Sequence, residues 1–475
     1  MSNKNIKKPF LTAKMTKSTK NSSYFSLPNS RFSTDSLYLT KNASPYSDEF
    51  MNTHILSVSV DFVDQPFAKP LQLSTGLITV LTEARVSIKV SVNGKEAEGQ
   101  SNIYLSDLWA WPGGDLTHEE KDAAMRGACR TIADNLFALC GNKEAHPLEL
   151  GLRLHESLDH LAPEVPLLAR AVCASPFDAA IHDAVGNALK ISAFDFYGSH
   201  FPIPSADSLF KQGSATAAIR ALFQSPKAAL PAWWIVSARD DLEATLKPAI
   251  EKSGYFSYKV KILAKDHRED ALRVSEIYQA ARQWGVATPR LSVDSNEGNP
   301  DTSSVRDFLH YLKECDSEAY GALEYLEQPT ARDILAHPFD WHEVAALKPV
   351  LLDEGLTSFH LLGIAKQQGW SGFALKTCKG HSFTLVCAAW AKENDMLLSV
   401  QDLTNPGASA LHSALLASHI DSINGAEINS PQFTPAANTA WLKNLGGIFH
   451  PQKGWHEVPA KNFTGLGSHL QEKED

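Results

Sequence analysis

The sequence lacks the features that mark several classes of protein. Its six cysteines, in a chain of 475 residues, include no pair with Cys-x-x-Cys spacing, so neither a zinc framework nor a disulfide scaffold is indicated. No run of eighteen or more apolar residues occurs, which argues against a membrane-spanning helix. The net charge of −10 gives no support to nucleic-acid binding. We therefore expect a cytoplasmic protein with no nucleic-acid or membrane partner.

The first fifty residues have few acidic and apolar side chains. Residues 1–41 are rich in Lys, Ser, Thr and Asn and hold one acid, Asp35. Such a composition cannot bury enough apolar surface to fold alone. We expect residues 1–50 to form a disordered tail.

The remaining chain has ordinary composition, with 43% hydrophobic and 21% charged residues, and enough length for a large barrel with an added lobe. Strand-like alternation between residues 54 and 92 is followed by an Asn93-Gly94 turn, which predicts an antiparallel meander. Helical patterns take over from His118. Residues 51–168 should form a separate α+β domain.

A second sequence pattern begins near Leu230, where short apolar runs alternate with amphipathic helical patterns. Eight such runs predict strands at 232–237, 257–263, 290–294, 322–327, 350–353, 372–376, 396–401 and 425–428. The alternation indicates an α/β fold with a parallel (β/α) barrel over residues 169–430. A doubly wound open sheet is the alternative, but its functional residues would gather at one switch point.

Three acids end successive strand candidates: Asp294, Glu327 and Asp353. The chemistry of a barrel lies at the carboxyl ends of its strands, so these carboxylates can converge from neighbouring strands. Hard divalent cations such as magnesium prefer carboxylate oxygens. The alternative interpretation is that each acid simply caps the helix that follows.

Lysines end the strands on either side of the acids. Lys259 and Lys261 point to the same side of their strand, and Lys376 ends the sixth strand, roughly opposite the second. Burial and mutual repulsion should lower a lysine pKa and make a neutral base available. Bases on both faces of one carbon would permit deprotonation on one side and reprotonation on the other. A structural ion-pair network is the alternative.

The ordered motifs Lys-Val-Lys, Val-Asp-Ser-Asn, Leu-Glu-Gln-Pro, Leu-Asp-Glu and Ala-Leu-Lys-Thr-Cys-Lys resemble the muconate lactonizing enzyme subgroup of the enolase superfamily. The resemblance implies a barrel of modified TIM type under an α+β capping domain, to which residues 431–475 return. It also implies one Mg²⁺ on Asp294, Glu327 and Asp353. Lys261 and Lys376 would be the acid/base pair, with Lys259 supporting an enediolate.

The chain departs from the family pattern where specificity is set. Gln401 and Asp402 stand where relatives often carry a glutamate, and Glu427-Ile-Asn429 replaces the paired aspartates of dipeptide epimerases. We expect the substrate to contact the side chains of Asn296, Asp402, Glu427 and Trp111. The segment 64–76 resembles a mobile loop that closes on substrate.

The resemblance implies removal of a proton alpha to the carboxylate of a small-molecule substrate. Racemisation or epimerisation of an acylamino acid or dipeptide is the first expectation. Cycloisomerisation or dehydration, as in muconate cycloisomerases or o-succinylbenzoate synthases, uses the same lysines and is the alternative. A non-enzyme alternative is a catalytically silent relative that binds a carboxylate. Similar proteins are usually homo-oligomers.

Overall fold

The computed structural model of the chain describes residues 51–73, 76–197, 201–459 and 463–472. The tail expected at 1–50 lies outside the described residues. Among the described residues, no helix has the length and apolar character needed to cross a bilayer.

An antiparallel sheet forms the N-terminal part of the described chain. It has the order β1-β2-β3, with β1 at Thr53–Leu73, β2 at Gly76–Val92 and β3 at Lys95–Tyr104. The Asn93-Gly94 turn joins β2 to β3 with positive φ at both residues, 51° and 77°, as a tight hairpin turn requires. The segment expected as a loop at 64–76 contains the end of the β1–β2 hairpin, with strand structure up to Leu73 and again from Gly76.

Helices α2 (His118–Leu139) and α4 (Leu167–Leu189) pack against this sheet. Helices α1 (Asp107–Ala110) and α3 (Pro147–Ser157) pack against α2 and α4. Helix α4 is buried along nearly its whole length and packs against β2 and β3. The approach is close at Gly99 of β3, where a Cβ atom would lie 2.1 Å from the backbone nitrogen of Ala184.

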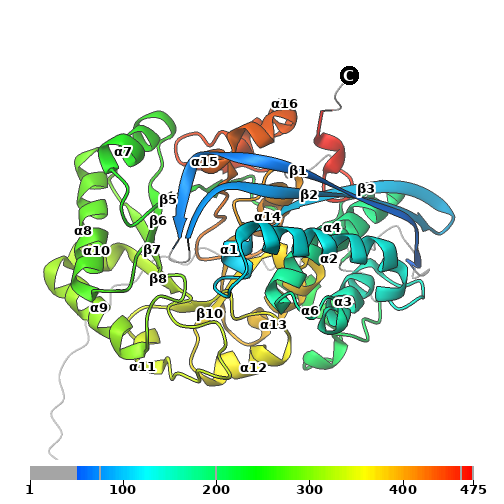
Figure 1. Ribbon diagram of the computed structural model, residues 1–475, viewed down its shortest axis with the longest axis horizontal. Coiled ribbons are helices and arrows are strands. Elements are labelled where there is room, and N and C mark those ends of the chain that lie inside the picture. The colour runs from blue at the N-terminus through cyan, green and yellow to red at the C-terminus, as the bar shows by residue number, and fades with distance from the viewer. Residues whose placement is uncertain (1–50, 74–75, 198–200, 460–462, 473–475) are drawn as a thin grey trace, which may run out of the picture. The chain divides into compact units, whose positions relative to one another are not determined.

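The C-terminal segment returns to α4. Asp183 accepts hydrogen bonds from the backbone N–H of Leu466 (2.7 Å) and of Ser468 (3.3 Å). Figure 1 shows these last described residues beside the N-terminal sheet. The domain boundaries at 168 and 430 stay a prediction.

Seven parallel strands form the second sheet, in the order β11-β10-β9-β8-β7-β6-β5. They are β5 (Trp233–Val236), β6 (Ser257–Lys261), β7 (Arg290–Asp294), β8 (Leu323–Glu327), β9 (Val350–Leu352), β10 (Gly372–Lys376) and β11 (Leu397–Gln401). Each falls inside the range expected from the apolar runs.

The eighth expected strand, 425–428, closes the barrel by single bridges. Ala426 bridges to Ala232, next to β5, and Glu427 bridges to Gln401 of β11. Two backbone hydrogen bonds join this segment to β11 and the residue after it, from the Glu427 N–H to the Val400 carbonyl (3.0 Å) and from the Asp402 N–H to the Glu427 carbonyl (2.9 Å). The Asn424 side chain adds two more. The Asn424 amide accepts a hydrogen bond from the backbone N–H of Val400 (3.0 Å) and donates one to its carbonyl (2.9 Å). The α/β barrel with an α+β cap is confirmed.

Helices between the strands surround the barrel (Figure 1). They are α7 (Leu242–Ser253), α8 (His267–Gln283), α9 (Thr302–Cys315), α10 (Ser317–Ala322), α11 (His342–Ala345), α12 (His360–Gln367), α13 (His381–Glu393) and α14 (Gly407–His419). The remaining elements are α5 (Ala193–Phe196), α6 (Ala215–Leu222), β4 (Ala229–Pro231), α15 (Ser430–Phe433), α16 (Leu442–Phe449) and β12 (Trp455–Glu457). Short 3₁₀ helices lie at Leu158–His160, Asp207–Leu209, Thr377–Lys379, Pro435–Trp441 and Ser468–Leu470.

Candidate active site

The strand ends bring the predicted acids and lysines together. Strand register places Lys261 of β6 opposite Asp294 of β7, and Asp294 opposite Glu327 of β8. Asp353 follows β9 directly, and Lys376 is the last residue of β10. All of these side chains are buried. They are held inside the protein as one charged cluster, which is costly unless the charges are paired.

Lys259 lies at the centre of this cluster. Its ammonium nitrogen is 2.9 Å from Glu327 Oε1, 3.2 Å from Asp294 Oδ2 and 3.3 Å from Glu427 Oε2. It also donates a hydrogen bond to Gln401 Oε1 at 3.3 Å. One buried cation therefore joins acids from three different parts of the barrel.

The two expected bases flank this centre. Lys261 Nζ is 2.5 Å from Asp294 Oδ2 and donates to Asn296 Oδ1 at 3.0 Å. Lys376 Nζ contacts Asp353 Oδ2 and lies 3.3 Å from Glu327 Oε1. Each lysine thus meets a different aspartate.

The charges of the cluster stabilise one another. Burial opposes ionisation of Glu327, but the ammonium groups of Lys259 and Lys376 outweigh it and hold the Glu327 pKa below its usual value. For Lys376, burial alone would lower the pKa, yet the carboxylates of Asp353 and Glu327 raise it above the ordinary lysine value. The pKa of Lys259 is likewise raised, because the nearby carboxylates outweigh the effect of burial. The expected lowering of lysine pKa values is therefore wrong for Lys259 and Lys376 in this state, because their pairing with acids outweighs desolvation.

Three further residues, for which the sequence predicts no role, belong to the cluster. Lys379 Nζ lies 3.0 Å from Asp353 Oδ1. The Gln401 amide donates to Glu327 Oε2 and accepts from Lys259. Glu354 is buried, accepts from Asn296 Nδ2 at 3.3 Å, and has no hydrogen-bond partner for Oε2 among the described residues. Their position in the sequence could have indicated two of them, because Glu354 directly follows Asp353 and Lys379 comes three residues after Lys376.

Strained backbone marks the loops around this cluster. Asn296, Glu297, Gln328 and Thr404 are non-glycine residues with φ of 43°, 67°, 32° and 61°. Left-handed conformations at such residues cost free energy and gather at functional sites. The side chain of Gln328 helps to hold its left-handed backbone. Its side-chain oxygen accepts hydrogen bonds from the backbone N–H groups of Asp353 (2.9 Å) and Gly355 (3.0 Å).

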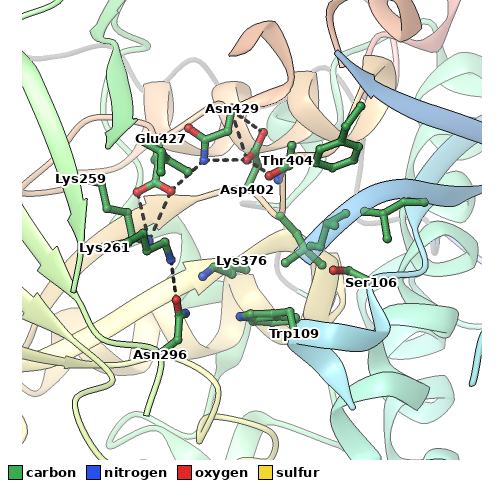
Figure 2. A pocket seen from close by; sticks show the side chains of 15 residues that line it. Ser106, Trp109, Lys259, Lys261, Asn296, Lys376, Asp402, Thr404, Glu427 and Asn429 are labelled. Carbon is green, nitrogen blue, oxygen red and sulfur yellow. Dashed lines mark hydrogen bonds and ion pairs between the residues drawn. The ribbon is translucent and has the colours of Figure 1, made fainter. Parts of the chain in front are cut away.

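A cavity of about 40 Å³ opens above the cluster, between barrel and cap (Figure 2). Its barrel side includes Lys259, Lys261, Asn296, Lys376, Asp402, Glu427 and Asn429. Its cap side includes Phe67, Ile78 and Leu81 from the β1–β2 hairpin, together with Trp109. The hairpin end therefore takes part in the site.

Trp109, not Trp111, lines the cavity. The Lys376 ammonium lies 5.1 Å from the centre of the Trp109 ring, and the Lys379 ammonium lies 5.9 Å from it, within cation–π range. Arg332 donates to the Trp109 carbonyl at 3.1 Å. Trp111 is half-buried outside the cavity lining, so its contact with substrate stays a prediction.

The structure thus gathers most of the expected site residues. Those expected to contact substrate or transfer protons line the cavity, except Trp111: Lys259, Lys261, Lys376, Asn296, Asp402 and Glu427. Asp294, Glu327 and Asp353 stand next to it, each in contact with one or more of the lysines.

The three acids match magnesium in donor type, since all are carboxylates on successive strand ends. Across the residues that the structure describes, no group of three or more His, Cys, Asp or Glu side chains stands in metal-binding geometry. The acids are instead turned onto ammonium groups, with Lys259 between Asp294 and Glu327 and Lys376 between Glu327 and Asp353. The three carboxylates are suitable ligands for a divalent cation. In this structure they pair with lysine ammonium groups.

Known proteins with related sequence or fold are enzymes. No protein-family model matches the chain. Muconate cycloisomerase 1 of Rhodococcus opacus is 25% identical over 331 residues, which cover 68% of this chain and 73% of that protein. The muconate lactonizing enzyme of Pseudomonas fluorescens, solved with muconolactone, superposes with a TM-score of 0.58 at 19% identity, over 88% of this chain and 96% of the other.

A second solved structure is a dipeptide epimerase of Enterococcus faecalis, complexed with Mg and the dipeptide L-Leu-L-Tyr. It superposes with a TM-score of 0.60 at 15% identity, over 87% of this chain and 99% of the other. At such identities the structural likeness shows the fold alone.

Proposed function

We propose that this chain, a member of the muconate lactonizing enzyme subgroup of the enolase superfamily, removes the proton alpha to a carboxylate and forms an enediolate. The resemblance carried by its five motifs is confirmed by the cycloisomerase relative and by the shared fold. The observation that carries the proposal is the pair Lys261 and Lys376. Both reach one cavity, from the second and sixth strands of the barrel.

Each residue has a role that its contacts support. Lys261 and Lys376 move the proton, one on each face of the substrate carbon. Lys259, fixed by three acids, supplies positive charge where the enediolate oxygens develop. Asn296 orients Lys261 through the 3.0 Å hydrogen bond.

Asp294, Glu327 and Asp353 would hold one Mg²⁺. When bound, the cation would supply positive charge to the substrate carboxylate. Lys261 and Lys376 would give or take the proton at Nζ, and in this structure each lies against an aspartate. The cavity of about 40 Å³ has room for a few water molecules, so we infer that these lysines and the cap hairpin shift when substrate enters.

Racemisation or epimerisation of an acylamino acid or dipeptide is the function we favour, because a lysine on each face suits a two-base reaction. Cycloisomerisation, the reaction named for the Rhodococcus relative, or dehydration needs the same machinery and remains the second candidate. We further propose a cytoplasmic location and a homo-oligomeric state.

Deuterium exchange tests the proposal. The protein is incubated in D₂O with Mg²⁺ and acylamino acids, dipeptides or unsaturated dicarboxylates, and alpha-deuterium is measured by mass spectrometry or NMR. We expect exchange in at least one class, accompanied by loss of optical purity for a racemase. Tight magnesium binding without exchange in any class would favour the silent, carboxylate-binding alternative.

A further inference from the structure

The loop after β8 carries an arginine that reaches from the barrel to the cap. Arg332 Nη2 donates a hydrogen bond to the carbonyl of Trp109, a residue 223 positions away, at 3.1 Å. Trp109 lies on α1, which is only four residues long. The carbonyls of so short a helix have no following turn to pair with. The barrel arginine therefore supplies a hydrogen-bond donor that the cap segment itself does not offer.

Glu297, in the loop after β7, fixes the direction of the Arg332 side chain. Glu297 Oε1 accepts from Arg332 Nε at 2.8 Å and also from Nη2, while Oε2 accepts the Arg332 backbone N–H at 2.7 Å. A planar guanidinium held by two N–H groups has little freedom to turn. The same Nη2 group that contacts Glu297 is thereby aimed at the Trp109 carbonyl.

Loops that carry site residues also fix the backbone at Arg332. Glu297 directly follows Asn296, which lines the cavity. On the other side, Gly355 lies so close that a Cβ atom there would be 2.7 Å from the Arg332 carbonyl oxygen. Gly355 comes two residues after Asp353. The position of Arg332 is therefore set by the loops after β7 and β9, which belong to the site.

The ring next to this hydrogen bond covers one end of the cavity. Figure 2 shows Trp109 beside Lys376 at this end, and Asp402 and Asn429 at the other. The Lys376 ammonium lies 5.1 Å from the centre of the Trp109 ring. Cation–π attraction acts within about 6 Å of the ring centre, so this contact depends on where α1 is held.

Buried hydrogen bonds join the cap to the barrel at a different place. Asn102 Oδ1 accepts the backbone N–H of Ser409 at 3.0 Å, and Asn405 Oδ1 accepts the backbone N–H of Tyr104 at 3.2 Å. These contacts connect β3 to the loop after β11 and the start of α14. The Arg332 side chain, in contrast, is 25% exposed. Removing it should loosen α1 without releasing the whole cap.

We propose that Arg332, oriented by Glu297, is a positioning residue for proton transfer, which seats Trp109 against Lys376 by binding the end of α1 to the barrel. The inference rests on the proposed function, because it takes Lys376 as one of the two bases. It assigns a role to an ion pair that lies outside the cavity lining. The surroundings of Lys376 are then complete only when α1 is bound to the barrel.

Arg290 offers a matched control for a test of this role. Its side chain is also 25% exposed, pairs with a glutamate, Glu324, and donates to a backbone carbonyl, that of Ile423, at 2.8 Å. It stands at the start of β7, at the opposite end of the strand from Asp294. Arg332→Met and Arg290→Met therefore remove the same kind of contact at opposite ends of the barrel.

Hydrogen–deuterium exchange of the full chain tests the seating of α1 without any substrate. The N–H groups of Ala110 and Trp111 donate to Ser106 and Asp107 within this segment, so their exchange reports its local opening. We expect exchange at least about tenfold faster in Arg332→Met and within about twofold of wild type in Arg290→Met. Glu297→Gln keeps the shape of the pair without its charge. It should speed exchange at least about threefold, which keeps the test available if Arg332→Met does not fold.

Turnover tests whether the seating acts through Trp109. With the substrate found by the deuterium-exchange screen, Arg332→Met should lower kcat by roughly three- to tenfold and leave KM within about threefold. In a Trp109→Leu background the same change should cost no more than about twofold, because the ring that it positions is gone. Arg290→Met should keep kcat within about twofold of wild type.

The inference is overturned if the exchange of α1 is unchanged in Arg332→Met, or if Arg290→Met speeds it equally. It is also overturned if the two losses of turnover multiply in the double variant. If the wild type turns over none of the compounds in the screen, the proposed function fails. Faster exchange of α1 in Arg332→Met alone would still support the seating of Trp109 by Arg332.

Discussion

The two ends of the cavity hold buried carboxyl groups in opposite ways. Glu327 and Asp402 are both almost completely buried. Glu327 lies against the ammonium groups of Lys259 and Lys376, and its pKa falls below the usual value despite burial. Asp402 has N–H partners without an ion pair, and burial raises its pKa to about 8.

The difference teaches that the partner, and not depth, sets the charge of an acid in this site. Desolvation favours the neutral form of both side chains, and only a paired cation reverses that preference. Under the proposed function, the end with paired acids serves proton transfer and cation binding. At the other end, Asp402 accepts hydrogen bonds from N–H groups and forms no ion pair within the described residues. Variants that remove one partner at a time should therefore have unequal effects.

The largest expected effect comes from removing a lysine at the paired end. Lys261→Ala and Lys376→Ala should each lower turnover of the substrate found by the exchange screen by about 10³-fold, the scale of a lost general acid or base. Each variant should retain exchange from the face served by the other lysine. Optical purity and alpha-deuterium, measured separately for the two enantiomers, distinguish these outcomes.

Lys366→Ala is the matched control for these two variants. Lys366 is exposed on α12 and donates to Asn394 at 3.0 Å, so turnover should match that of the wild type. If the double variant Lys261→Ala/Lys376→Ala still turned over substrate, the assignment of the bases would be wrong.

The next effect concerns the cation. Glu327→Gln removes one of three carboxylates and should weaken Mg²⁺ binding by roughly 100-fold or more, because a neutral amide is a poorer ligand for a hard cation. Asp402→Asn, the same change of a buried acid at the other end, should leave Mg²⁺ affinity within about twofold. Calorimetric titration measures both. Equal losses in the two variants would contradict the division of the cavity.

Much of this arrangement follows from the sequence, because strand periodicity and strand ends are local. Lys261, Asp294, Glu327 and Lys376 are each the last residue of a strand, and each follows from an apolar run that stops at a charged residue. The apolar run at 425–428 predicts the position of the eighth strand, but it does not reveal the Asn424 side chain beside it, which bonds the backbone of a residue 24 positions away. The raised pKa values of Lys259 and Lys376 likewise come from contacts with acids on other strands, which no single run reveals.

Trp109 and Trp111 illustrate the same limit. Both belong to one short segment, and the sequence offers no periodicity over α1 that decides which ring faces the barrel. The contact of Arg332 with the Trp109 carbonyl joins residues 223 positions apart and is visible only in the fold. The prediction favoured Trp111, while the cavity is lined by Trp109.

A smaller effect is expected in the pH dependence of the unfolding free energy, to which Asp402 contributes. A carboxyl group in an unfolded chain titrates near pH 4, whereas Asp402 in the fold titrates near 8. Between these values the folded state binds more protons, so unfolding free energy falls as pH rises, by up to about 1.4 kcal/mol per pH unit from this group. Asp402→Asn should remove that share of the slope.

Urea unfolding of wild type and Asp402→Asn between pH 5 and 8 measures the difference. Glu354 keeps part of the slope in both proteins, because burial and the charge of Asp353 raise its pKa to about 8 as well. The informative quantity is therefore the difference in unfolding free energy between the two proteins, which should shift in favour of the variant as pH rises. A difference that does not change with pH would mean that Asp402 is already ionised in the fold.

The smallest effect belongs to the cap. Trp109→Leu removes the aromatic face beside Lys376 and Lys379, a contact that contributes about 0.5–2 kcal/mol when partly desolvated, so turnover should fall by roughly three- to tenfold. Trp109→Phe keeps a ring and should recover most of the activity. Trp111→Leu, at a half-buried position outside the cavity lining, is the matched control and should remain near wild type. A larger loss from Trp111→Leu than from Trp109→Leu would instead support the contact expected from the sequence, and the cap would then have to close differently on a bound substrate.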